Sequence, residues 1–149
     1  RLTKHATVQR EAPTHEILKY RRRMDVLVEA GALVAIENKL DSLEQRDQVK
    51  DYLEHLRQST RGRQTRLIYL TLDGKTPKSL HSSVMDQQQR IGRLHCWSYQ
   101  RELRAWLESC RRDCQAQKIR DFLSDLIAYI ESALKRQSEN NREKEADEN

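Results

Sequence analysis

Two adjacent segments that favour β-strands constrain this chain more than any other feature. In residues 24–28, Met24, Val26 and Val28 alternate with Asp25 and Leu27, which is the two-residue period of a strand, and residues 33–39 are a second expected strand. The three residues between Glu29 and Leu33 include a glycine and supply a turn. The pattern predicts a β-hairpin.

The rest of the chain predicts one mixed α/β fold. A helix over residues 43–58, with Val49, Leu53 and Leu56 as its apolar stripe, precedes a buried strand over residues 66–72. Strand, helix and strand in this order predict a crossover connection and a mixed sheet. The remaining expected elements are a strand at 6–11 stopped by Ala12 and Pro13, a helix at 83–91, a strand at 94–98, and helices at 99–110 and 115–136.

Composition sets the limits of this fold. With 149 residues and 36% hydrophobic residues, the chain suits one domain, which we place at residues 1–136. Residues 137–149 have no apolar side chain larger than alanine and are expected to be a disordered charged tail. No apolar run approaches the length of a membrane span. Three cysteines, an odd number, make no disulfide framework and favour a cytoplasmic location.

Charge is unevenly placed along the chain. Residues 1–136 carry 26 Lys and Arg against 18 Asp and Glu, although the net charge of the whole chain is +5. A basic body favours a polyanionic partner, because each cation placed on a phosphate releases counterions. A solvated surface is an equally good explanation of the same charges.

The predicted hairpin brings together two carboxylates and an amine. Glu37 and Lys39 lie two apart on one strand and therefore share a face. A three-residue turn at 30–32 pairs residues whose numbers sum to 62, which places Asp25 opposite Glu37. A two-residue turn would instead pair Asp25 with Ile36 and direct it to the other face.

Such a set suits a hard divalent cation and phosphodiester hydrolysis. Two neighbouring carboxylates repel each other unless a cation lies between them, and oxygen ligands favour Mg²⁺. A magnesium ion lowers the pKa of bound water and stabilises charge on a phosphate. Lys39 is placed to orient the attacking water and offset developing negative charge, and the backbone carbonyl of Asn38 is a further candidate ligand.

The same residues resemble the PD-(D/E)XK nuclease superfamily. Residues 22–28 (RRMDVLV) are similar to a strand written RRIDI, and residues 36–39 match IENK. Residues 47–52 (DQVKDY) resemble a helix start written DQLxxY, and residues 69–74 (YLTLDG) resemble a strand end written YLTPDG. The resemblance covers about residues 5–135. It implies a restriction-endonuclease-like core with two long C-terminal helices, DNA cleavage, Mg²⁺ (with Mn²⁺ as a substitute), metal ligation by Asp25 and Glu37, and Lys39 as the catalytic lysine.

Two departures from the family pattern stand out. Met24 occupies the position of the proline in the family motif. The core helix that usually precedes the first strand is missing or truncated, since only residues 1–5 are left for it. That helix often supplies a further acidic residue, for which Glu11 is a candidate substitute.

Four further residues are candidates for positioning nucleic acid. Gln48 and Tyr52 lie four apart on one helix face, and related nucleases use such a pair beside the active site. The alternative is a solvated polar edge with Tyr52 half in the core. Arg21 and Arg23 alternate onto the Asp25 face whereas Arg22 faces away, and strand solubility is the rival explanation for these arginines.

The sequence therefore predicts a metal-dependent nuclease acting on DNA of undetermined strandedness. One rival is a non-catalytic nucleic-acid-binding or regulatory module on the same fold. The other is an interaction protein that forms a homodimer through its C-terminal helices.

Overall fold

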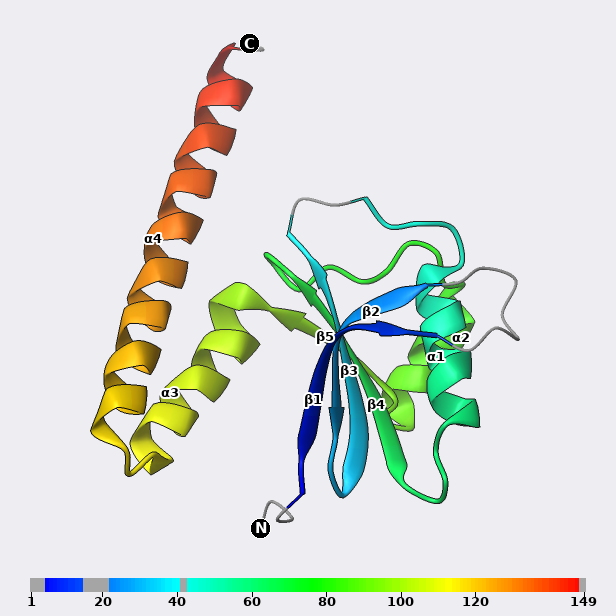
Figure 1. Cartoon of the computed structure of the whole chain (residues 1–149). Helices are drawn as coiled ribbons and strands as arrows, with labels where there is room; N and C mark the ends of the chain where they lie inside the picture. The colour runs from blue at the N-terminus through cyan, green and yellow to red at the C-terminus, as the bar shows by residue number, and fades with distance from the viewer. Residues whose placement is uncertain (1–4, 15–21, 41–42, 148–149) are drawn as a thin grey trace. The chain divides into compact units, whose positions relative to one another are not determined.

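Five strands form one mixed sheet in the computed structural model (Figure 1), which describes residues 5–14, 22–40 and 43–147, with side chains up to Arg136 and at Glu139. The strand order is β1-β2-β3-β4-β5, with β1 antiparallel to β2, β2 antiparallel to β3, and β3 parallel to β4. The bounds are β1 Thr7–Pro13, β2 Arg23–Glu29, β3 Ala32–Lys39, β4 Gln64–Thr71 and β5 Leu94–Ser98. This mixed sheet with flanking helices is the predicted restriction-endonuclease-like α/β fold.

The β2–β3 hairpin has the register that a three-residue turn requires. Paired residues run from Glu29 with Leu33 to Val26 with Ile36, and each pair of numbers sums to 62. The next position along β3 is Glu37, and beyond it the Asn38 N–H donates to the carboxylate of Asp25. The two acidic residues therefore lie where the paired part of the hairpin ends.

β1 continues further than predicted. We expected Ala12 and Pro13 to stop it, but they pair with Met24 and Arg23. Proline is tolerated here because β1 is an edge strand and needs no outward N–H.

α1, Gln48–Gln58, connects β3 to β4, and the predicted start at residue 43 is wrong. Leu43 is 91% exposed, and Asp47, directly before the helix, has a left-handed backbone. Tertiary contacts hold this segment outside the helix. Glu44 accepts hydrogen bonds from Lys78 and Ser79. Arg22 donates to Gln45 and to the backbone carbonyl of Arg46, the two residues that follow Glu44. These partners are distant in sequence, so local periodicity does not detect them.

The core of the sheet unit lies between the strands and α1. α2, Ser82–Arg90, lies beside α1 on the same side of the sheet (Figure 1). Val49, Tyr52 and Leu56 form the buried stripe of α1, and Leu53 packs at its edge. Their partners in the sheet include Leu33, Ala35 and Leu67. This packing fixes the α1 face next to the end of β3.

The C-terminal part forms a second compact unit. The chain divides into two compact units, residues 1–97 and 98–149. A single domain over residues 1–136 stays a prediction. A π-helical segment η1, Tyr99–Leu103, leads into α3, Arg104–Asp113, and then α4, Gln117–Asp147. Leu107 of α3 packs against Ile127 and Ile130 of α4.

α4 differs from the sequence prediction at its C-terminal end. The helix continues to Asp147, through the segment expected to be disordered. Glu, Lys, Arg, Gln and Ala have good helix propensity, and no glycine or proline interrupts residues 117–147. Among the described residues, no helix is long and apolar enough to cross a membrane.

Candidate active site

Glu37 and Lys39 form a buried ion pair on β3. Lys39 Nζ lies 2.9 Å from Glu37 Oε1, and the side chains are only 8% and 3% exposed. The two-residue spacing puts both on the face that α1 covers, as the alternation of β-strands requires. An ammonium and a carboxylate are thus held together where solvent is largely excluded.

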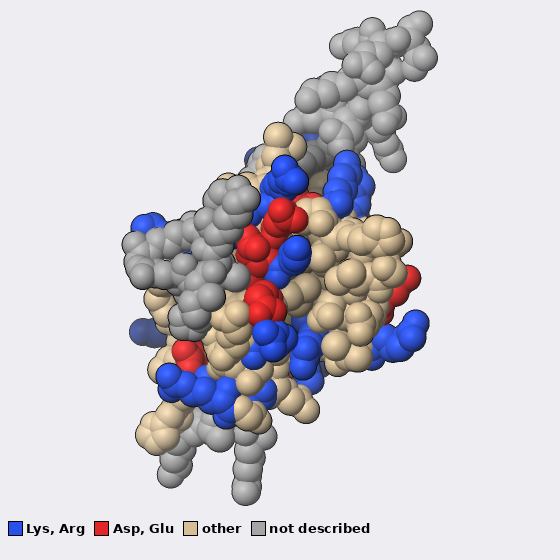
Figure 2. Space-filling model, turned by 90° about the vertical axis from the view of Figure 1, so that its right-hand side faces the viewer, with Lys and Arg blue, Asp and Glu red and all other residues tan. Residues whose placement is uncertain are grey.

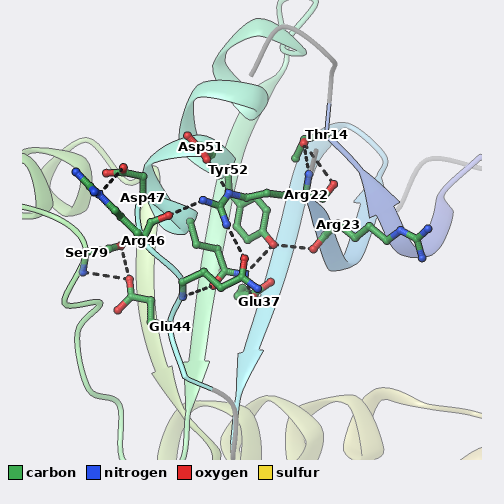
Figure 3. Close-up of polar contacts among 12 residues, drawn as sticks. Thr14, Arg22, Arg23, Glu37, Glu44, Arg46, Asp47, Asp51, Tyr52 and Ser79 are labelled. Atoms are coloured by element: carbon green, nitrogen blue, oxygen red, sulfur yellow. Dashed lines mark hydrogen bonds and ion pairs between the residues drawn. The ribbon is translucent and has the colours of Figure 1, made fainter. Parts of the chain in front are cut away.

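The first turn of α1 supplies a second partner for the same carboxylate oxygen. Gln48 Nε2 donates to Glu37 Oε1 at 2.8 Å and to the Tyr52 hydroxyl at 3.0 Å. The Tyr52 hydroxyl in turn donates to the backbone carbonyl of Arg23 at 2.6 Å (Figure 3). The Gln48 amide group is therefore engaged inside the protein, and Tyr52 is fully buried rather than half in the core.

The other oxygen of Glu37 has no hydrogen-bond partner among the described residues. Oε2 is buried, while both Lys39 and Gln48 contact Oε1. Buried polar atoms are nearly always satisfied, so an orphaned carboxylate oxygen requires an explanation. A hard divalent cation, which prefers carboxylate oxygen, fits this position.

Asp25 lies close enough to influence Glu37 electrostatically. Its Oδ2 accepts a 2.7 Å hydrogen bond from the Asn38 N–H. Burial raises the pKa of Glu37 above its usual value, and the negative charge of Asp25 raises it further. The hydrogen bond and positive charge of Lys39 act in the opposite direction. Without a cation, this site therefore disfavours the ionised form of Glu37.

Glu11 is not gathered with these residues into one acidic cluster. Arg10 pairs with Val26 and Ala12 with Met24, which puts Glu11 at the position opposite Asp25. Glu11 has φ 50° and an exposed side chain. No group of three or more His, Cys, Asp or Glu suited to a metal occurs in the part of the chain that the structure describes. Its role as a ligand stays a prediction.

The three arginines before Asp25 differ in their surroundings. Arg22, predicted to face away from the site, is buried and donates to Asp51 Oδ2 at 2.6 Å and Gln45 Oε1 at 2.7 Å. The Arg23 side chain is exposed and extends away from Glu37 (Figure 3). Arg21 lies outside the described residues.

Sequence reasoning did not single out two residues near the site. Tyr69 of β4 is in register with Glu37, and burial together with Glu44 and Glu37 raises its pKa to about 12. Glu44 accepts from the backbone N–H groups of Lys78 at 2.7 Å and Ser79 at 3.2 Å, and from the Ser79 hydroxyl. Tyr69 stood in a segment that carries the family resemblance, but no local pattern indicates the partners of Glu44.

A mixed sheet with a buried Glu-x-Lys pair and a nearby aspartate is the arrangement expected of a nuclease-type protein. The family model described as the PD-(D/E)XK nuclease superfamily matches residues 2–146. The chain belongs to this superfamily, whose members generally hydrolyse phosphodiester bonds and typically use divalent metal ions. The match extends across both compact units. A search of curated proteins and a search of solved structures gave no match.

Proposed function

We propose that this protein is a metal-dependent nuclease that hydrolyses phosphodiester bonds of DNA. The observation that carries the proposal is the orphaned Oε2 of Glu37, buried beside Lys39 and within electrostatic reach of Asp25. The excess of Lys and Arg in residues 1–136 supports a polyanionic substrate.

Asp25, Glu37 and the Asn38 carbonyl are the candidate ligands for Mg²⁺ or Mn²⁺. The bound cation would lower the pKa of a coordinated water and offset charge on the phosphate. Gln48 holds Oε1 of Glu37, which leaves Oε2 for the cation. Because Gln48 contacts only one of the two oxygens, the Glu37 carboxylate is oriented before any cation binds.

Lys39 has the role of orienting the attacking water. Its ammonium carries three donors, and Glu37 Oε1 is within ion-pair distance of it. A fixed cation in a largely dry site stabilises developing negative charge without reorganisation. The burial of Lys39 therefore suits the transition state better than an exposed lysine would.

The test is cleavage of plasmid and single-stranded DNA with Mg²⁺ or Mn²⁺, and with chelator. Asp25→Ala and Lys39→Ala are compared with Lys50→Ala, which removes an exposed lysine of α1. We expect metal-dependent cleavage in the wild type and the control, and loss in the two site variants. Salt-sensitive binding without cleavage in the wild type would overturn the proposal in favour of a non-catalytic module.

A homodimer through the C-terminal helices is part of the proposal. Ile119, Phe122 and Tyr129 of α4 are 53%, 61% and 64% exposed, and their spacing places them along one stripe of the helix. A second copy of the chain would cover this stripe. We expect Phe122→Glu to lower the mass measured by light scattering to that of a monomer, whereas Ala128→Glu, at an exposed position outside this stripe, leaves it unchanged.

A cytoplasmic location is proposed from the cysteines. Cys96, Cys110 and Cys114 are all free thiols, which suits a reducing compartment.

A further inference from the structure

A pocket lies near the N-terminal end of β4, away from the acidic residues. It has a volume of about 380 Å³ and is lined by the start of β4 and the turn after α2. Three of its nine lining residues are arginines, Arg63, Arg66 and Arg93, and none is acidic. The pocket is therefore lined by positive charge and neutral polar groups.

Two of these arginines are not neutralised by an ion pair. Arg63 lies 3.1 Å from Glu29, but within the described part of the chain no carboxylate pairs with Arg66 or Arg93. Arg61 and Arg90, which flank the pocket in sequence, are also exposed. Lys and Arg gather along the lower edge of the face in Figure 2, the edge where α1 leads into β4.

The pocket and the acidic site do not share one face of the sheet. On β4, the exposed Gln64 and Arg66 alternate with the buried Thr65, Leu67 and Tyr69, and Tyr69 is in register with Glu37. The pocket is therefore a separate surface from the acidic site.

We infer that this pocket binds the phosphates of a nucleic-acid backbone, as a contact separate from the acidic site. Guanidinium groups suit this ligand because their planar donors match phosphate oxygens. Contacts of this kind carry no base information, so they add affinity without sequence preference. The identity of the ligand rests on the proposed function, but binding at the pocket requires no catalysis.

The test is binding of a fluorescent 20-base-pair duplex and a 20-nucleotide single strand in EDTA, followed by anisotropy over a range of NaCl concentrations. The double variant Arg66→Gln/Arg93→Gln removes both unpaired charges. The matched control Arg112→Gln/Lys118→Gln removes two exposed charges from the C-terminal unit. Arg66→Lys/Arg93→Lys keeps both charges in the pocket.

We expect the Gln double variant to reduce the slope of log K against log salt by about 1.8 on the duplex and about 1.4 on the single strand. The control and the Lys double variant should keep the wild-type slope. An unchanged slope in the Gln double variant, or no binding by the wild type at low salt, would overturn the inference. Absence of cleavage in Mg²⁺ with this slope change present would overturn the proposed nuclease activity alone.

Discussion

Gln48 and Lys39 contact the same oxygen of Glu37, at 2.8 Å and 2.9 Å, from α1 and β3 respectively. The other oxygen is buried without a partner among the described residues. Two elements thus determine which carboxylate oxygen is left for a ligand.

Gln48→Ala should weaken metal binding rather than nucleic-acid binding. The substitution frees Glu37 Oε1 from α1, so the carboxylate is no longer held in one orientation. Loss of a group that orients a metal ligand costs about 10–100-fold in metal affinity or activity. The measurement is the Mn²⁺ concentration that gives half-maximal cleavage, together with DNA binding in EDTA. Gln58→Ala, an exposed glutamine on the same helix, is the control; equal Mn²⁺ requirements in the two variants would contradict the positioning role.

Tyr52→Phe should destabilise the fold. The hydroxyl accepts from Gln48 and donates to the Arg23 carbonyl, so its removal leaves two polar groups without this partner in a buried place. The expected loss in the free energy of unfolding is about 1–3 kcal/mol, measured by urea denaturation. The control is Tyr129→Phe, which removes a hydroxyl from a side chain that is 64% exposed and should leave the free energy of unfolding unchanged.

Removing each of its two charged neighbours should shift the pKa of Glu37 in opposite directions. Asp25→Asn removes a negative charge and lowers this pKa, whereas Lys39→Met removes a hydrogen bond and a positive charge and raises it. The ¹³C chemical shift of the Glu37 carboxyl, titrated in EDTA, reports both changes. Asp73→Asn, an exposed aspartate in the turn after β4, is the control.

The sign of the effect on stability follows from the raised pKa. Between the usual value of 4.5 and the raised value, the folded protein holds a proton that the unfolded chain has released. The contribution of Glu37 to the free energy of unfolding therefore falls as the pH rises through this window. Asp25→Asn should narrow the window and Lys39→Met should widen it. Identical titrations in both variants would show that the three groups are not coupled.

The alternating pattern was enough to predict the hairpin. Its register depended on the turn length, which the sequence left open between two and three residues, and the structure has the register of the three-residue turn. The Glu-x-Lys spacing then gave a shared face without any knowledge of the sheet. These predictions rest on local geometry that tertiary contacts do not alter.

The contacts that complete the site depend on the tertiary structure. Gln48 was identified as a residue near the site, but its donation to Glu37 depends on where α1 packs. Residues 43–47 have the pattern of a helix and are not one, because Glu44 binds residues about 35 positions away. Helix propensity depends on the local sequence alone, so it does not detect such distant partners. The helical end of α4 is a different case: disorder was predicted there because residues 137–149 lack apolar side chains, although residues 137–147 favour a helix by their own propensity.

A final prediction concerns the ion pair between Arg22, directly before β2, and Asp51 of α1. Arg22 Nε lies 2.6 Å from Asp51 Oδ2, with the side chains 7% and 16% exposed, and the guanidinium also binds Gln45 and the Arg46 carbonyl. Arg22→Met leaves the Asp51 charge in a mostly buried place without its cation. The expected loss in the free energy of unfolding is about 3–5 kcal/mol.

The control for Arg22→Met is an ion pair of similar length in an exposed place. Arg57 and Glu54 on α1 also meet at 2.6 Å, but their side chains are 58% and 36% exposed. Arg57→Met should therefore leave the free energy of unfolding nearly unchanged. Arg22→Met/Asp51→Leu should recover part of the stability, because an apolar pair no longer strands a charge. Equal losses in the free energy of unfolding for Arg22→Met and Arg57→Met, measured by urea denaturation, would show that burial does not strengthen the Arg22 contacts.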